Sequence, residues 1–161
     1  MMNSLLPRLN VPAAGAAGAN TAPARQVVQV DNEQIVVAAP TWTLLPELSI
    51  SVTTDAGDIL HLAGSVTWTH GATNTPFMSF EVDAGVAYPR TMLGLRSNYG
   101  PPPVRASNVQ VDFWIDGLAA GVHVIDFYGY TNGVVTITVQ APAVIGGVQI
   151  QSKIACVRYG S

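Results

Sequence analysis

The chain has 161 residues, of which 48% are hydrophobic and only 11% are charged, and its formal net charge is −3. Average proteins carry roughly 25% charged residues, so a solitary domain of this composition is short of charges for its surface. No run approaches the roughly 18 to 20 apolar residues of a membrane-spanning helix. The six Arg and one Lys are scattered and form no basic stripe for a phosphate backbone. We therefore expect partner subunits, and neither a membrane nor a nucleic acid, to cover part of the surface.

Residues 1–34 differ in composition from the rest and predict an extended N-terminal arm. An Ala/Gly tract fills residues 13–24 and cannot bury enough apolar surface to fold alone. An ordinary disordered terminus is the alternative, but a short apolar cluster favours an arm that lies across a neighbouring protein. The cluster consists of Leu5, Leu6, Leu9 and Val11. The predicted folded domain is residues 35–161.

Alternating apolar and polar residues predict β-strands along this domain. The pattern is clearest at residues 48–68, where two alternating runs flank a Thr-Asp-Ala-Gly turn signal. Asn132-Gly133 stands between two further alternating runs and predicts a hairpin. About eight or nine strands of this kind, with no stretch of helical period, predict an all-β fold, a jelly-roll-like antiparallel β-sandwich. The single cysteine, Cys156, excludes an intrachain disulfide and is expected as a small buried thiol in the last strand.

The long predicted strand at residues 104–115 places a tryptophan on its polar face. Val109, Val111, Phe113 and Ile115 are expected to point inward, so Trp114 points outward. A tryptophan in that position is covered by a partner subunit, is exposed to stack on a sugar or receptor, or is an unremarkable surface residue. We favour a subunit interface and assign Trp42 to the same interface.

The titratable residues form no catalytic or metal-binding pattern. The histidines are His61, His70 and His123, and their spacing is not that of metal ligands. Three aspartates could converge as an acid/base pair or a cation site if their strands are neighbours, but the alternation favours solvent-facing carboxylates. They are Asp112, Asp116 and Asp126. We expect neither an enzyme nor a bound metal or cofactor.

A long irregular stretch at residues 89–103 ends in three consecutive prolines. Loops of this length in compact domains are uncommon and often functional. If the protein recognises a ligand, the expected contacts in this loop are Arg96, Asn98 and Tyr99.

Three stretches carry a resemblance to a known class of proteins. They are PTWTLLPELSISV (residues 40–52), FEVDAG (residues 80–85) and GLAAGVHVI (residues 117–125). They resemble the jelly-roll virion proteins of bacteriophages, namely capsid decoration, cement and fibre-head modules that trimerise. The shared motifs are turns and core positions and include no active site. The resemblance implies a homotrimer that works by binding.

The resemblance and the predicted arm together give two expectations of function. The first is a structural virion protein that binds the outside of a capsid as a trimer and clamps neighbouring capsid subunits through its arms. Its partners would be the major capsid protein and copies of itself. The second is a receptor- or glycan-binding head module of a phage fibre. Because MMNSLLPRLN has no basic region followed by an apolar stretch, synthesis is expected in the host cytoplasm and the final location on the capsid surface.

Overall fold

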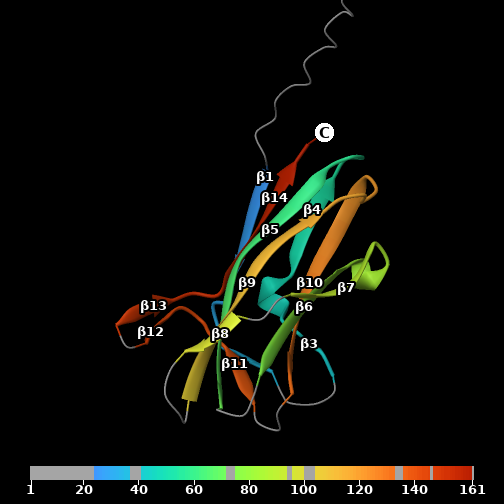
Figure 1. The fold of residues 1–161 in the computed structure, drawn as a ribbon. Helices are drawn as coiled ribbons and strands as arrows, with labels where there is room; N and C mark the ends of the chain where they lie inside the picture. Colours follow the sequence, from blue (N-terminus) through green and yellow to red (C-terminus); the bar gives the residue numbers. More distant parts are fainter. Residues whose placement is uncertain are drawn as a thin grey trace, which may run out of the picture.

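A computed structural model describes the fold as two antiparallel sheets packed face to face (Figure 1). The residues that the structure describes are 24–36, 41–71, 75–93, 96–99, 104–132, 136–145 and 147–160. Their regular secondary structure consists of β-strands and two short 3-10 helices, η1 (Pro46–Leu48) and η2 (Asp83–Gly85). The predicted all-β sandwich is therefore confirmed. None of the helices in these ranges has the length and apolar character needed to cross a membrane.

The first sheet has seven strands and is built around the long strand β5 (Ile59–Gly71). One edge of β5 pairs along its length with β9 (Val104–Ile115), which in turn pairs with β8 (Arg96–Tyr99). The opposite edge of β5 is shared: β14 (Lys153–Tyr159) pairs with its first half and β11 (Ile137–Val139) with its second half. The outermost strands are β1 (Ala24–Gln29), beside β14, and β2 (Gln34–Val36), beside β11.

The second sheet has five strands around β10 (Gly121–Thr131). One edge of β10 pairs with β4 (Ile50–Thr54) and β3 (Thr43–Leu44), and the other with β6 (Pro76–Val82). β7 (Tyr88–Leu93) lies outside β6. A separate two-stranded ribbon consists of β12 (Ala143–Ile145) and β13 (Val148–Ile150).

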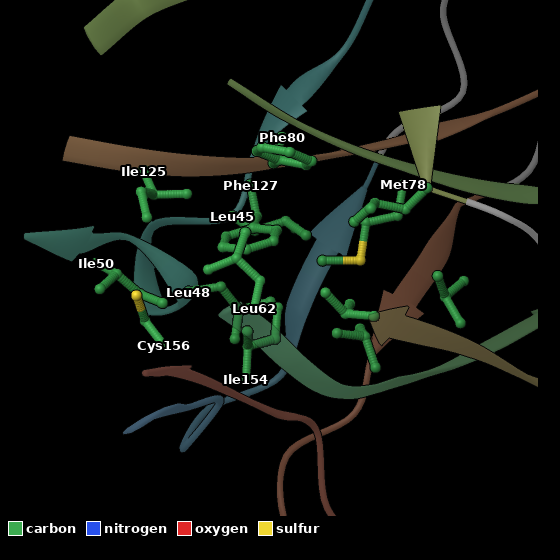
Figure 2. Packing of buried hydrophobic residues seen from close by; sticks show 14 of the residues in the cluster. Leu45, Leu48, Ile50, Leu62, Met78, Phe80, Ile125, Phe127, Ile154 and Cys156 are labelled. Carbon is green, nitrogen blue, oxygen red and sulfur yellow. The ribbon is translucent and has the colours of Figure 1, made fainter. Parts of the chain in front are cut away.

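The core lies between the two sheets and is formed by the apolar positions of the alternating pattern. Figure 2 shows side chains from both sheets meeting there, including Phe80 and Phe127 from the second sheet and Leu62 and Ile154 from the first. The predicted inward positions Val109, Val111 and Ile115 are buried, and Phe113 packs against the core. Cys156 is 2% exposed, as predicted, and burial raises the pKa of its thiol to about 11. At physiological pH this thiol is a packing group.

One predicted connection between strands is different in the structure, and one predicted turn joins the two sheets. The turn that follows residue 54 carries the chain from β4 in the second sheet to β5 in the first. The predicted hairpin at Asn132-Gly133 is wrong, because β10 lies in the second sheet and β11 pairs with β2 and β5 in the first. The reason is that both strands bury one face in the same core, so the alternation is identical whether two strands pair side by side or face each other across the sandwich.

The structure also changes the predicted boundaries. The described residues contain fourteen strands, more than the eight or nine expected, because several strands have only two to four residues. Pairing with β14 makes Ala24–Gln29 a strand of the first sheet, so the part of the predicted arm from Ala24 onward belongs to that sheet. The stretch at residues 89–103 is not one long loop, since β7 and β8 occupy most of it.

Candidate functional site

The outer face of the first sheet carries an exposed aromatic cluster. Trp114 is 56% exposed, and its ring stacks on that of His61 with centroids 4.1 Å apart and planes within 7°. Tyr159 of β14 also contacts Trp114, at a centroid distance of 5.6 Å, and is 40% exposed. These contacts hold the indole in one orientation while most of its surface remains open to a partner.

Strand register shows which residues surround this cluster. Side chains at directly paired positions lie on the same face of a sheet, so the pairings define three rows across β1, β14, β5 and β9 (Figure 1). The row that contains His61 and Trp114 is completed by Arg25 and Val157. The next row is Val27, Ala155, Ala63 and Asp112, and the third is Gln29, Lys153, Ser65 and Gln110. We name these twelve residues the grid face.

The centre of the grid face is hollow because its side chains are small. A depression of about 470 Å³ lies over Ala63, Gly64 and Ser65 of β5. Its rim includes Lys153 on one side and Asp112 on the other. Gly64 itself faces the opposite way, where its backbone closely approaches that of β14. The face therefore combines a small-residue centre with longer side chains around it.

The charges of the grid face are separated by sign. Arg25 and Lys153 are exposed on β1 and β14, whereas the Asp112 side chain is 80% exposed on β9. His61 Nε2 lies 2.8 Å from Asp112 Oδ1, so that carboxylate also orients the imidazole. Asp116, which follows the end of β9, is exposed as well. One rim of the face is therefore basic and the other acidic.

The second sheet presents a different outer face. Trp42 packs on Tyr130 of β10 at a centroid distance of 5.2 Å, and Tyr130 contacts Phe77 of β6. Tyr130 points outward because its neighbour Gly129 faces the core, against Trp68. Trp42 and Trp114 thus lie on opposite outer faces of the sandwich. A contact in which the first sheets of two copies face each other therefore includes Trp114 and leaves Trp42 outside.

A polar network stabilises the outer face of the second sheet. Glu81 is almost fully buried and accepts hydrogen bonds from Arg90 Nε at 3.0 Å and from the Tyr128 hydroxyl at 2.7 Å. The Arg90 guanidinium also lies 4.1 Å above the centre of the Tyr128 ring. Burial, followed by the neighbouring Glu81 carboxylate, raises the pKa of Tyr128. The charges of Glu81 and Arg90 neutralise each other. The network therefore holds β6, β7 and β10 together rather than offering a reactive group.

Two of the resembling motifs meet in a partly buried ion pair. Asp83, in FEVDAG, lies 2.7 Å from His123 Nδ1, in GLAAGVHVI, and also accepts a hydrogen bond from the Val124 N–H. His123 Nε2 donates to the Ala119 carbonyl oxygen at 2.9 Å. The Ala119 carbonyl first, and then Asp83, raise the pKa of His123, while the Val124 N–H first, and then His123, lower the pKa of Asp83. With acceptors at both ring nitrogens, His123 is held as the imidazolium.

This ion pair makes stability depend on pH. The contribution of His123 is complete below its ordinary pKa of 6.5 and is lost as the pH rises through the raised value in the folded state. Above pH 6.5 we therefore expect the free energy of unfolding of the wild type to fall relative to that of His123→Gln. Urea unfolding of both proteins at half-unit steps of pH measures this difference. Parallel curves for the two proteins would contradict the assignment of the imidazolium.

The structure describes only some of the predicted site residues. Leu5, Leu6, Leu9 and Val11 lie outside the described residues. Arg96, Asn98 and Tyr99 belong to β8, which pairs with β9, so their backbone is strand and not the loop that we expected. Their side chains lie outside the described part of the structure.

The titratable residues considered for catalysis do not converge. Asp112 lies on the outer face of the first sheet and Asp126 on the outer face of the second, where it accepts a 2.6 Å hydrogen bond from Ser49 Oγ. His70 is buried, and its Nε2 lies 2.7 Å from Ser107 Oγ. It is in the second half of β5, whereas His61 is in the first half and His123 is on β10 of the other sheet. Within the ranges described above, no group of three or more His, Cys, Asp or Glu side chains could hold a metal ion.

Comparison with known proteins does not assign a family. No protein-family model and no curated protein sequence matches the chain. Among solved structures, the chain is similar to one described as "Structure of infectious bursal disease virus Gt strain", with 10% sequence identity and a TM-score of 0.45. The match covers 92% of this chain and 42% of that one, so this chain spans less than half the length of the viral protein. A similarity of this size assigns no function.

Proposed function

We propose that this protein is a structural component of a virion, a homotrimer that binds the outside of a capsid and clamps neighbouring capsid subunits. The observation that carries the proposal is the grid face, an ordered surface with an exposed tryptophan on a chain with only 11% charged residues. Surfaces of this kind are typical of subunit interfaces, which are enriched in aromatic residues and depleted of charge at their centre. The resemblance to jelly-roll virion proteins of bacteriophages gives the proposal its biological setting.

In this proposal, the arm supplies the attachment to the shell. The chain enters the first sheet at Ala24, on the outermost strand β1. The preceding residues 1–23 could span about 75 Å when fully extended, at roughly 3.3 Å per residue, which is enough to cross onto an adjacent subunit. The contacts would be Leu5, Leu6, Leu9 and Val11, because burial of apolar surface contributes about 25 cal/mol per Å².

Three arms on one trimer bind more tightly than one arm. Once the first arm is bound, the second and third contacts are intramolecular, and such multivalency can raise the apparent affinity by about 10²- to 10⁴-fold. The major capsid protein is the proposed partner and the capsid surface is the proposed location. Among the described residues, only the exposure of Trp114 favours the receptor- or glycan-binding alternative.

Deletion of residues 1–23 is expected to abolish binding to capsids without unfolding the domain, because β1 begins at Ala24. The measurement is co-sedimentation of purified protein with particles that lack it, with bound copies counted per capsid subunit. The full-length protein should saturate at a fixed ratio to the capsid protein, and the truncated protein should stay in the supernatant. Circular dichroism would check that the truncated protein keeps its strand content.

Point variants test whether the apolar side chains of the arm, and not only its length, are needed for binding to capsids. Leu5→Ser together with Leu6→Ser should weaken binding strongly, whereas the same polar change at Ala16 and Ala17 in the Ala/Gly tract should not. Full binding by the truncated protein would rule out the arm as the anchor. Failure of the full-length protein to bind any particle, combined with binding to host cells, would favour receptor recognition instead.

A further inference from the structure

The grid face has the layout of a self-association surface. Its middle consists of small or apolar side chains, Ala63, Ala155 and Val157, and a large aromatic anchor, Trp114, stands beside them. Val27 at the β1 end is 50% exposed although it is apolar. Interfaces between protein subunits commonly have such an apolar centre with a polar rim, and tryptophan is among the residues that contribute most to their binding energy.

The charged residues at the rim of the grid face indicate which partner it can bind. Arg25 and Lys153 are exposed along β1 and β14, while Asp112 and Asp116 are exposed along and just after β9. Because β14 and β9 lie on opposite sides of β5, the basic and acidic groups occupy opposite sides of the same face. A neighbour that carries the same face can bring its acidic side against the basic side of the first. The face is therefore complementary to a copy of itself.

We infer that the grid face binds a second copy of this chain, with the β9 side of one copy against the β1 and β14 side of its neighbour. This inference rests on the proposed self-association of the chain and specifies its interface. It assigns Trp114 to the interface and leaves Trp42, on the other sheet, outside it. The central depression over Ala63 and Ser65 would accept a side chain of the neighbouring copy, since a void at an interface would lose contacts.

Charge reversal tests the inference with the full-length protein. One variant carries Arg25→Glu and Lys153→Glu, a second carries Asp112→Lys and Asp116→Lys, and a third carries all four changes. Either pair alone places like charges opposite each other, which disfavours association. The first two variants should associate about 100-fold more weakly than the wild type, and the third should regain association because the complementarity is restored. Sedimentation velocity over a concentration series measures this, and Glu33→Lys, an exposed change outside the face, is the control.

The aromatic anchor gives a second and independent measurement. Trp114→Ser should dissociate the oligomer, while the matched change Trp42→Ser on the opposite face should not. Circular dichroism of each variant separates dissociation from unfolding. A wild type that is monomeric, or a four-fold variant that remains dissociated, would overturn the inference. Native mass spectrometry of the wild type gives the copy number, and a dimer would keep the face but reject the trimer.

The inference and the proposed function can fail separately. A wild-type oligomer that dissociates on charge reversal but does not co-sediment with capsids would retain the interface and reject the virion role. Capsid binding by a protein whose charge-reversed variants stay oligomeric would retain the virion role and reject the grid face.

Discussion

Replacing Asp83 by alanine is expected to lower the free energy of unfolding by about 3 kcal/mol. Removing one partner of a buried ion pair typically costs about 3–5 kcal/mol, and the lower end applies because the Asp83 side chain is 31% exposed. His123 is only 8% exposed and would lose the carboxylate partner of its Nδ1, although its Nε2 can still donate to the Ala119 carbonyl. The Val124 N–H would also lose its acceptor. Urea unfolding followed by circular dichroism measures the loss.

Asp83→Asn is the matched control for this variant. Asp83 has a φ of 54°, and Asn and Asp adopt this left-handed conformation more readily than alanine does. Asparagine therefore keeps the backbone preference and an oxygen acceptor but removes the charge, so its loss should be intermediate. If both variants unfold at the urea concentration of the wild type, the ion pair does not stabilise the fold.

Replacing Gly64 by valine is expected to cost about 3 kcal/mol or more, at the upper end of the range for overpacked interiors. A Cβ atom at this position would lie 2.3 Å from the Lys153 carbonyl oxygen and 2.8 Å from the Ile154 Cα. Both are backbone atoms, so the clash cannot be relieved by a change of rotamer. β14 would have to move away from β5, and β1 would move with it. Amide hydrogen exchange should show the loss of protection first in β14.

The control for this second variant is Ala63→Ser, one position earlier in the same strand. Its side chain points outward over the central depression, where there is room for one more atom. We expect a change within about 0.5 kcal/mol, as for most surface substitutions. Because valine could prevent folding altogether, Gly64→Ala gives the same test in a milder form. Unfolding of Gly64→Ala at the wild-type midpoint would show that β14 is free to shift.

The sequence was sufficient to predict the fold class and the buried face of most strands. In β9, for example, alternation alone placed Val109 and Val111 inward and Trp114 outward, and the structure agrees. This works because a strand with one buried face must alternate with period two. The same reasoning identified Cys156 as a buried thiol.

Strand partners and the contacts between them could not be predicted in the same way. Alternation is local, whereas pairing depends on residues far apart in the chain, as between Leu60 and Ile115. For this reason the sequence signalled a hairpin at Asn132-Gly133 where the chain crosses between sheets. The stacking of His61 on Trp114 requires knowledge of this register. The Asp83 and His123 pair had one usable signal, since both residues lie in motifs that carry the resemblance.

The pairing of β1 with β14 joins the first and the last described strands, and it also limits the order in which they can form. β14 is the last strand in the described chain, and it pairs with β1 and with one edge of the first half of the central strand β5. Strands that pair over long sequence separations form late, because loop closure must precede their contacts. During synthesis Ala24–Gln29 would therefore have no strand partner until residues 153–159 have left the ribosome. A chain that ends before β14 would leave β1 without its strand partner, so the first described strand takes its place only after the last has been made.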